Sequence, residues 1–595
     1  MAKTPLDTNN KPISFVIKFN GREINPDFRV FSIKVKEGLS QFSSARIEII
    51  AGNATENLFE ESEESSFKPG AKIEISLGFE EINKTVFKGV VSGQKISLRQ
   101  GYANNPYYSI LVLECIDEAA KLNGIYKDRI FTDQKDSQVM TTLIGETSVS
   151  KSIVATSFEQ EVIRQKQQSN WDLIKHLCKR NGLVIYNSQS KVTIEEPTSS
   201  GSSLVTITQG KDVDSFFAEI NSLNQIKGVK ISGWDDFNNK SDSKVANEYT
   251  KLSKPGDLNS QTLGKIFHSN NHEFLAQSPK DASWIQEDAN GMLFQSRIKR
   301  VRGEVTTRGL NFASVGKIAT LKGFGSHFDG DIYISGLEHT LSEGDFKTKL
   351  IFGFPLFNNL TFENPSQKSE GLLIGTVKEL EKDPKKENRI KVLLQGFESS
   401  TNFVWCKLSQ MYVSKTGSSQ FLPEIGTQVV VGFLHNETEF PVVLGCLYDK
   451  NNKPYEKFDK KNDIKSISTR EKLTIEFDDK DKAITIITPD KNSIVIDDKA
   501  KKITIKDSND NQIETSSSGI TITSKKDITL KASGKLNLTG SKGVKVDGGS
   551  SGSVKISGQS ISADAKSKFS TNAKGTTEIK STGAVNIKGS LVNLN

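Results

Sequence analysis

Cysteine is scarce in this sequence. The 595 residues include four cysteines, Cys115, Cys178, Cys406 and Cys446, which are widely spaced and never form a CxxC pair. This spacing argues against the common zinc-binding and dithiol motifs, which need two cysteines close together. Isolated cysteines are typical of reduced, buried thiols, so we expect a protein that folds in the cytoplasm.

Long apolar runs are also missing. The N-terminal residues, Met1–Pro5, are not followed by the apolar segment of a signal peptide. No stretch approaches the roughly 20 apolar residues that a membrane-spanning helix needs. We therefore expect neither a signal peptide nor a transmembrane segment, so that a dedicated machine must export the protein if it leaves the cytoplasm.

Neither sign of charge dominates the composition. Lysine and arginine number 79 against 72 aspartate and glutamate, which gives a net charge of +7. An excess this small over this length does not indicate a nucleic-acid-binding protein. The hydrophobic content of 35% is low for one large globule, and the length indicates several domains. The composition suits folded domains joined to an element with a polar exterior.

Motifs for catalysis and for cofactors are absent. The sequence has no Walker or HExxH motif. His268 and His272 have the spacing of a helical metal site, but the Ser-Asn-Asn between them is a poor helix former, which favours surface histidines. The neighbouring carboxylates Asp235 and Asp236 would face opposite sides of a strand. We therefore expect a non-enzymatic protein with no catalytic residue, no cofactor and no metal.

A short repeat dominates the C-terminal part. An apolar–polar–apolar triplet recurs about every eight residues, with Gly, Ser, Lys, Asn and Asp in between. The triplets are Ile520–Ile522, Ile528–Leu530, Leu536–Leu538, Val544–Val546, Val554–Ile556, Ile561–Ala563, Phe569–Thr571, Val585–Ile587 and Val592–Leu594. Each offers two inward side chains, and the repeat is too short for one coil of a single-chain β-helix. We expect three chains to wind around one axis as an intertwined trimeric β-helix.

The chain as a whole is predicted to be mainly β. Alternating apolar and polar residues predict strands at 15–19, 45–50, 72–77 and 86–91, and two capped apolar stripes predict helices at 136–144 and 169–182. Five short strand candidates in under eighty residues favour a small closed barrel of the OB-fold type. The predicted organisation is a strand-rich domain with a few helices over 1–360, the OB-fold over 371–448 and the triple-stranded β-helix over 472–595.

The barrel carries the most specific motif. In order, it contains Arg389–Val392, Trp405, Phe421–Gly426, Val429–Phe433 and Pro441–Gly445. This pattern resembles the OB-fold of the VgrG family, the valine–glycine-repeat spike proteins of contractile injection systems. The residues that carry the resemblance are Arg389, Trp405, Pro423, Glu424, Gly426, Pro441 and Gly445. Two further segments, Phe67–Gly70 and Phe87–Val91, resemble the hub domain of that family.

Two motif residues also make local physical sense. Gly426 precedes a strand at a point where the loop has to turn, which calls for a residue that tolerates a positive φ. Trp405 stands in a segment with a single basic residue, whereas base binding by an OB-fold needs exposed aromatic side chains in a basic groove. We expect Trp405 to pack the barrel.

The resemblance implies a structural spike, a homotrimer at the tip of a contractile injection apparatus. Its hub domain would cap the inner tube, and its rod would puncture the target envelope to deliver effectors. The last five residues, Leu591, Val592, Asn593, Leu594 and Asn595, are expected to bind a PAAR-type cone protein. Further implied partners are the hexameric inner-tube protein, baseplate components and effector cargo. Nucleic acid is not expected, and a membrane would be contacted only on puncture.

Assembly in the cytoplasm and export by the apparatus, or on it, follow from the same resemblance. The machine that the spike serves can be a type VI secretion system, a phage or an extracellular phage-tail-like particle.

The main alternative function is a receptor-binding or baseplate fibre, but such fibres usually end in a folded lectin-like head, which the repeat region lacks. A β-helical polysaccharide lyase would need longer coils and a cluster of catalytic residues. An inserted lysozyme does not fit either, because about two dozen polar residues separate Tyr448 from Leu473.

Overall fold

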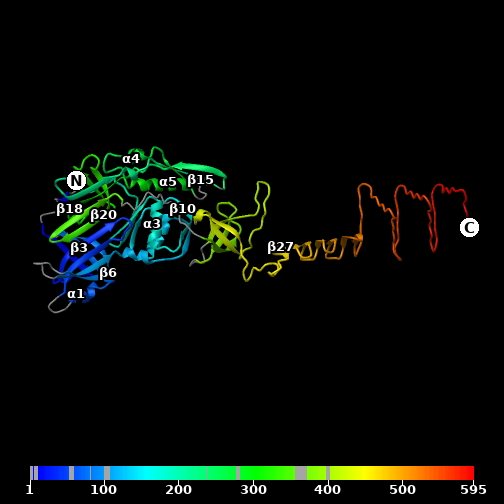
Figure 1. Cartoon of the computed structure of the whole chain (residues 1–595), viewed down its shortest axis with the longest axis horizontal. Helices are drawn as coiled ribbons and strands as arrows, with labels where there is room; N and C mark the ends of the chain where they lie inside the picture. The colour runs from blue at the N-terminus through cyan, green and yellow to red at the C-terminus, as the bar shows by residue number, and fades with distance from the viewer. Residues whose placement is uncertain are drawn as a thin grey trace. The chain divides into compact units, whose positions relative to one another are not determined.

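The computed structural model describes most of the chain. The described residues are 4–5, 11–52, 59–80, 82–99, 108–235, 237–276, 282–354, 371–396, 403–437 and 439–594. They form two compact units, Met1–Pro454 and Tyr455–Asn595. Strands outnumber helices among the regular elements of both units, so the prediction of a mainly β protein is confirmed (Figure 1).

The N-terminal unit is built on a 13-stranded sheet. Its main path runs β14 (Val213–Ile220), β18 (Val301–Arg308), β21 (Asp345–Phe352), β20 (Gly330–Ser342), β3 (Arg29–Gly38), β4 (Ser44–Ala51), β7 (Tyr108–Ile116), β6 (Lys84–Arg99), β5 (Lys72–Phe79), β1 (Ile13–Phe19) and β2 (Arg22–Glu23). β19 (Ile318–Lys322) joins β20 and pairs in parallel with β13 (Ser203–Thr208). The short helix α1 (Glu60–Glu63) follows β4 in the chain.

The alternation in the sequence explains which face of this sheet is buried. In β4, Ile47 and Ile49 are fully buried whereas the intervening Glu48 is not. Phe67, in the predicted hub motif, is also fully buried and packs against Phe19 and Phe28. The strands predicted at 15–19, 45–50, 72–77 and 86–91 all lie within observed strands.

Two helices cover smaller sheets in the middle of this unit. α2 (Asp136–Gly145) and α3 (Asn170–Arg180) confirm the predicted helices, and the Ser169 side chain caps α3 by accepting the N–H of Asp172. Leu177 and Cys178 lie on the buried face of α3. The neighbouring strands are β8 (Arg129–Lys135), β10 (Glu159–Gln165), β9 (Ser150–Ile153), β11 (Val184–Ser188) and β12 (Lys191–Glu195).

A separate lobe follows β14 in the chain. It has a three-stranded sheet, β16 (Lys240–Val245), β15 (Val229–Asp235) and β17 (His272–Leu275), and two helices, α4 (Ser260–Phe267) and α5 (Ala282–Arg297). The buried residues Ile285 and Leu293 of α5 pack in one core with Ile231 of β15. Neither of these helices was predicted from the sequence.

A closed five-stranded barrel completes the N-terminal unit. Its strands, in the order around the barrel, are β22 (Leu373–Glu379), β23 (Ile390–Leu394), β24 (Phe403–Leu408), β26 (Pro441–Cys446) and β25 (Gln428–Phe433). The barrel core consists largely of fully buried valines, among them Val377, Val392 and Val429. The predicted small closed barrel is therefore present.

The C-terminal unit begins with a seven-stranded antiparallel meander. The strands are β27 (Ile464–Ser468), β28 (Thr474–Asp478), β29 (Ala483–Ile487), β30 (Ser493–Asp497), β31 (Lys502–Lys506), β32 (Gln512–Ser516) and β33 (Gly519–Thr523). Each strand pairs with the next strand of the same chain. This differs from the prediction for the region from Lys472 onward, which was a β-helix of three intertwined chains. The reason lies in the turns, where residues such as Lys482, Lys491 and Lys501 adopt positive φ angles and let the chain reverse after five residues.

After the meander the backbone no longer forms regular secondary structure. Residues 524–594 contain no helix or strand, although they carry most of the predicted triplets. Three-chain winding of this segment stays a prediction. In the part of the chain that the structure describes, no helix is long and apolar enough to cross a membrane.

Candidate functional site

The meander of the C-terminal unit exposes a continuous apolar face. Five of its seven strands place two large apolar side chains on this face and the other two, β27 and β32, place one each. Cross-strand pairing aligns these side chains in columns. One column consists of Ile467, Ile475, Ile486, Ile494, Ile505, Ile513 and Ile522. The second contains Phe477, Ile484, Ile496 and Ile503, and after Thr515 it ends at Ile520. We call these side chains the isoleucine face.

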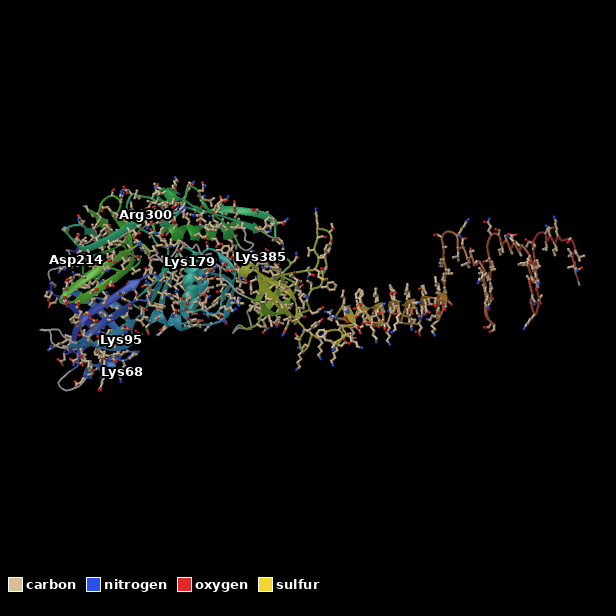
Figure 2. The ribbon with its side chains drawn as sticks, in the orientation of Figure 1. Lys68, Lys95, Lys179, Asp214, Arg300 and Lys385 are labelled. Carbon is tan, nitrogen blue, oxygen red and sulfur yellow. The ribbon has the colours of Figure 1, made fainter. Side chains whose placement is uncertain are left out.

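Among the described residues of the C-terminal unit, no second layer covers the isoleucine face. Ile494 is 40% exposed and Ile505 is 47% exposed, although both lie well inside the sheet. Figure 2 shows the side chains of the meander projecting from the ribbon with no second layer over them. Soluble proteins rarely expose apolar surface over so many neighbouring strands, so this face marks an interaction surface.

The opposite face of the meander is polar and carries matched charges. Lys502 and Glu514 lie 2.5 Å apart across β31 and β32, and the Lys499–Asp481 pair has the same separation. Val495 stands between Thr485 and Thr504 of the neighbouring strands. One face of the sheet is thus suited to water and the other to burial.

Exposed apolar residues continue to the end of the chain. Ile528 is 53% exposed and Leu538 is 66% exposed. The residues predicted to bind a cone protein are described up to Leu594. Leu591 and Leu594 are 77% and 87% exposed, Val592 is 47% exposed, and Asn593 is also exposed. Asn595 lies outside the described residues. Their role in binding a partner stays a prediction.

Arg389, the first residue of the barrel motif, joins the barrel to the preceding domain. Its buried guanidinium contacts Asp383 of its own domain at 2.7 Å and Glu161 of β10 at 2.5 Å. Lys385 reaches the second oxygen of Glu161 at 2.7 Å. Burial alone would raise the pKa of Asp383, but hydrogen bonds from Arg389 and from backbone N–H groups lower it to about 2.

Trp405 does not occupy the barrel core that was predicted for it. On β24 the side chains of Val404 and Cys406 point inward and are buried, so that of Trp405 points outward and is half-buried. Lys391, its partner on β23, places its ammonium group 5.5 Å from the ring centroid. The prediction that Trp405 packs inside the barrel is wrong because β24 alternates with the opposite phase.

The remaining motif residues shape the two ends of β25 and β26. Gly426 adopts a φ of +91°, as predicted, and donates its N–H to the carbonyl of Val377. Glu424 accepts the N–H of Thr427 in the same turn, and Pro423 is buried beside it. Pro441 begins β26, a position where a strand tolerates a missing N–H. Gly445 lies opposite Val430 and is exposed.

A cleft of about 360 Å³ lies beside the Arg389 contact. Aromatic side chains form part of its wall, with Phe158 and Trp284 in edge-to-face contact at 5.0 Å between centroids and Trp284 6.4 Å from Phe440. A second ion pair crosses from α3 to the barrel, where Arg180 contacts both Asp136 at 2.5 Å and Glu439 at 3.7 Å. The two domains of the N-terminal unit therefore meet through buried charges.

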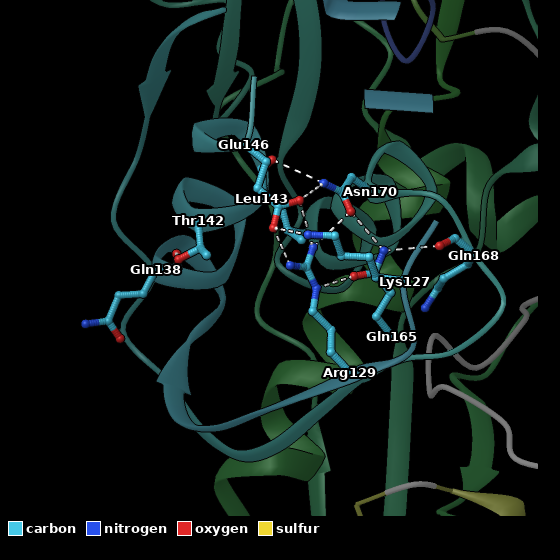
Figure 3. A network of polar contacts seen from close by, with 9 residues as sticks. All are labelled: Lys127, Arg129, Gln138, Thr142, Leu143, Glu146, Gln165, Gln168 and Asn170. Carbon is cyan, nitrogen blue, oxygen red and sulfur yellow. Dashed lines mark hydrogen bonds and ion pairs between the residues drawn. The ribbon is translucent and has the colours of Figure 1, made fainter. Parts of the chain in front are cut away.

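Another polar network holds the helical section together (Figure 3). Arg129 forms an ion pair with Glu146, donates to Gln165 at 2.7 Å and donates to Asn170 at 3.0 Å. Asn170 in turn donates to Glu146 at 2.8 Å. Burial opposes the charge of Glu146, but these donors outweigh it and lower its pKa to about 2. Every strong acceptor here is satisfied by a neighbour in the fold, which indicates a structural role.

No catalytic or metal-binding arrangement emerges from the described residues. No group of three or more His, Cys, Asp and Glu side chains among them could hold a metal ion. His268 follows α4 and His272 begins β17, so no helix joins them, although their rings lie 4.6 Å apart. Burial and the neighbouring His268 lower the pKa of His272.

Comparison with known families gives two matches. The model described as the Alg8 N-terminal domain matches residues 9–343, which is more than half of the chain. The model of the type VI secretion system/phage-baseplate injector OB domain matches residues 373–448, the range of the barrel. No curated protein matches the chain.

Solved structures include similar folds. A chain of the lidded Francisella PdpA–VgrG complex aligns with a TM-score of 0.50 at 11% identity, over 84% of this chain and 81% of that one. The E. coli c3393 protein, a type VI secretion component, aligns with a TM-score of 0.46 at 11% identity over 72% and 99%. The 43 kDa tail protein of prophage MuSo2 from Shewanella oneidensis gives 0.41 at 10% identity over 57% and 98%. The injector OB domain and the fold shared with the PdpA–VgrG complex confirm the predicted resemblance to VgrG-like spikes.

Proposed function

We propose that the chain, which belongs to the family of the Alg8 N-terminal domain, is the structural spike of a contractile injection apparatus. The injector OB domain and the VgrG-like fold support this proposal. It acts without enzymatic chemistry, as a homotrimer. The hub domain caps the inner tube and the barrel forms a collar. The C-terminal unit is the rod that punctures the target envelope and carries effectors with it.

The isoleucine face is the observation that carries this proposal. Its two columns leave about two-fifths of most of these side chains in water in a single chain, so the sheet needs other copies or a partner to cover it. Three copies packed with these faces inward give a closed prism whose outside is the polar, ion-paired face. The number three comes from the likeness to VgrG-type spikes.

The partners follow from the same assignment. The inner-tube hexamer and the baseplate contact the hub, and a PAAR-type cone covers Leu591–Asn595 at the distal end. Assembly takes place in the cytoplasm, and the apparatus then carries the spike out of the cell.

The mass of the purified full chain tests the proposal. Light scattering is expected to give three times the chain mass of 65.6 kDa, and negative-stain images are expected to show a compact head with a thin rod. Because the contacts along the rod are buried between chains, the trimer should dissociate only on unfolding. A folded monomer that stays monomeric at high concentration would refute the spike.

A further inference from the structure

Positive charge is concentrated in the last 72 residues. The segment 524–595 contains twelve lysines against three aspartates and one glutamate, a net charge of +8. Since the whole chain carries +7, residues 1–523 sum to −1. The lysines are Lys525, Lys526, Lys531, Lys535, Lys542, Lys545, Lys555, Lys566, Lys568, Lys574, Lys580 and Lys588. We call this segment the basic segment.

The lysines of the basic segment are accessible. All twelve are exposed, and Figure 2 shows the side chains of this part standing away from the ribbon. Among residues 524–594 two ion pairs occur, Lys545–Asp547 at 3.0 Å and Lys580–Glu578. Eight positive charges per chain are therefore left without compensation from this segment's own acidic residues.

The meander next to the basic segment is built differently. Residues 464–523 contain ten basic and eleven acidic side chains, and the pairs Lys502–Glu514 and Lys506–Asp510 hold them at 2.5 and 2.8 Å. Both parts repeat short apolar units, so a polar exterior alone does not require the excess of lysine. A need for solubility would be met equally well by the balanced charges of the meander.

The composition of the basic segment fits a lipid surface better than nucleic acid. It contains no arginine, and its one aromatic residue is Phe569. Proteins that bind nucleic acid rely on the planar fork of arginine and on aromatic side chains that stack on bases. Ammonium groups spread over many repeats instead suit a diffuse layer of anionic headgroups.

We propose that residues 524–595 form a basic surface that binds lipid bilayers rich in anionic headgroups. The choice of a membrane rests on the proposed spike function, which brings this part of the chain to a cell envelope. The charge itself belongs to every single chain, and a trimer would triple it. Because the lysines extend from Lys525 to Lys588, attraction would persist as successive repeats reach the headgroup layer.

Co-sedimentation of the full chain with lipid vesicles tests this inference. Vesicles of phosphatidylcholine with one-third phosphatidylglycerol are compared with pure phosphatidylcholine, at about 0.1 M and about 0.5 M salt. A lysine close to such a surface strengthens binding by about fivefold. We expect the anionic vesicles to bind at least about tenfold more tightly than the neutral ones, and high salt to remove most of the difference.

Two matched variants locate the binding surface. The first changes Lys531, Lys545, Lys555 and Lys566 to Gln in the basic segment. The control changes Lys465, Lys480, Lys499 and Lys506 to Gln in the meander, so both lose four charges. The first variant should bind anionic vesicles at least about tenfold more weakly, and the control should bind like the unmodified chain. Equal losses in the two variants, or equal binding to neutral vesicles, would overturn the inference.

Two further measurements separate this inference from the proposed function. Duplex DNA at the same phosphate concentration is titrated in parallel, and tighter binding to DNA than to vesicles would overturn the lipid assignment. Light scattering of each variant reports assembly. A trimer that ignores anionic vesicles overturns this inference and leaves the spike intact. A chain that binds them through the basic segment but never trimerises overturns the spike and leaves this inference intact.

Discussion

The substitution Ile494→Asp tests the isoleucine face in the centre of the meander. Ile494 is 40% exposed and lies between Ile486 of β29 and Ile505 of β31. Burying a whole isoleucine contributes roughly 1.5–3 kcal/mol, so covering the exposed two-fifths contributes about 1 kcal/mol per chain. A buried carboxyl group without a partner costs about 1–3 kcal/mol more. Three copies therefore weaken the trimer by roughly 6–12 kcal/mol.

Val495→Asp is the matched control for this substitution. Val495 is the next residue of β30, but it faces the polar side between Thr485 and Thr504. A carboxylate at that position stays in water, so we expect a change within about 1 kcal/mol. Sedimentation equilibrium at several protein concentrations measures the association of both variants, and denaturant unfolding measures their stability.

The pH dependence gives a second readout. Burial on the trimer axis would raise the pKa of the carboxyl group introduced by Ile494→Asp above its ordinary value, because the neutral acid is easier to bury. The free-energy cost of burying the charged carboxylate is therefore complete above the raised pKa and decreases as the pH falls below it. The variant should accordingly recover the trimer toward about pH 4. Equal losses for Ile494→Asp and Val495→Asp, or no loss in either, would show that the isoleucine face is not buried between chains.

Three further outcomes are expected. Ile528→Asp should destabilise the trimer whereas Lys531→Asp should leave its unfolding midpoint almost unchanged, which thermal unfolding checks. Deletion of Leu591–Asn595 should abolish the pull-down of a PAAR-type cone while the trimer persists, and loss of the trimer would instead assign these residues to folding. Arg389→Ala should destabilise the barrel by about 3–5 kcal/mol in denaturant unfolding, because it leaves buried carboxylates unpaired. Since the Arg389 side chain and backbone N–H groups together depress the pKa of Asp383 to about 2, the unmodified protein should lose the corresponding stability as the pH falls from about 4 to 2, and the variant should lose less of it.

The strands of the hub and barrel could be predicted because their signals are local. β4 alternates buried and exposed residues over eight positions, and the barrel strands keep the same alternation around valines. The turn at Gly426 was equally readable, since a positive φ before a strand favours glycine. Each of these features depends on residues only a few positions apart.

Helix α5 was missed because its sequence contains a local conflict. Asn290 and Gly291 stand in the middle of Ala282–Arg297 and resemble a helix end. In the fold, a side chain at Gly291 would place its Cβ 3.0 Å from the carbonyl oxygen of Arg180, so glycine allows α5 to pack closely against the end of α3. The close packing of the two helices explains why glycine stands at position 291. The sequence alone shows only that glycine is unfavourable inside a helix.

The ionic contacts between the domains could not be predicted from the sequence for a different reason. Arg389 and Glu161 are 228 residues apart in the sequence, and nothing around either of them marks the other as its partner.

The meander was only partly predicted. Its apolar residues were visible as short repeats, but whether such a unit reverses in a hairpin or winds onward is decided by single turn residues such as Lys491.

The direction of the isoleucine columns bears on how a rod could transmit force. The columns cross every strand of the meander, so they run along the direction in which the strands stack. Seven strands at about 4.8 Å give a stack of roughly 29 Å from the first strand to the last. A load along this direction presses side chains of one column against each other, and closely packed interiors have low compressibility. Exposed columns of a single chain offer no such support, because its sheet can bend toward the open side. Stiffness under load thus requires the same closure that burial requires, and the trimer measurement on Ile494→Asp tests both.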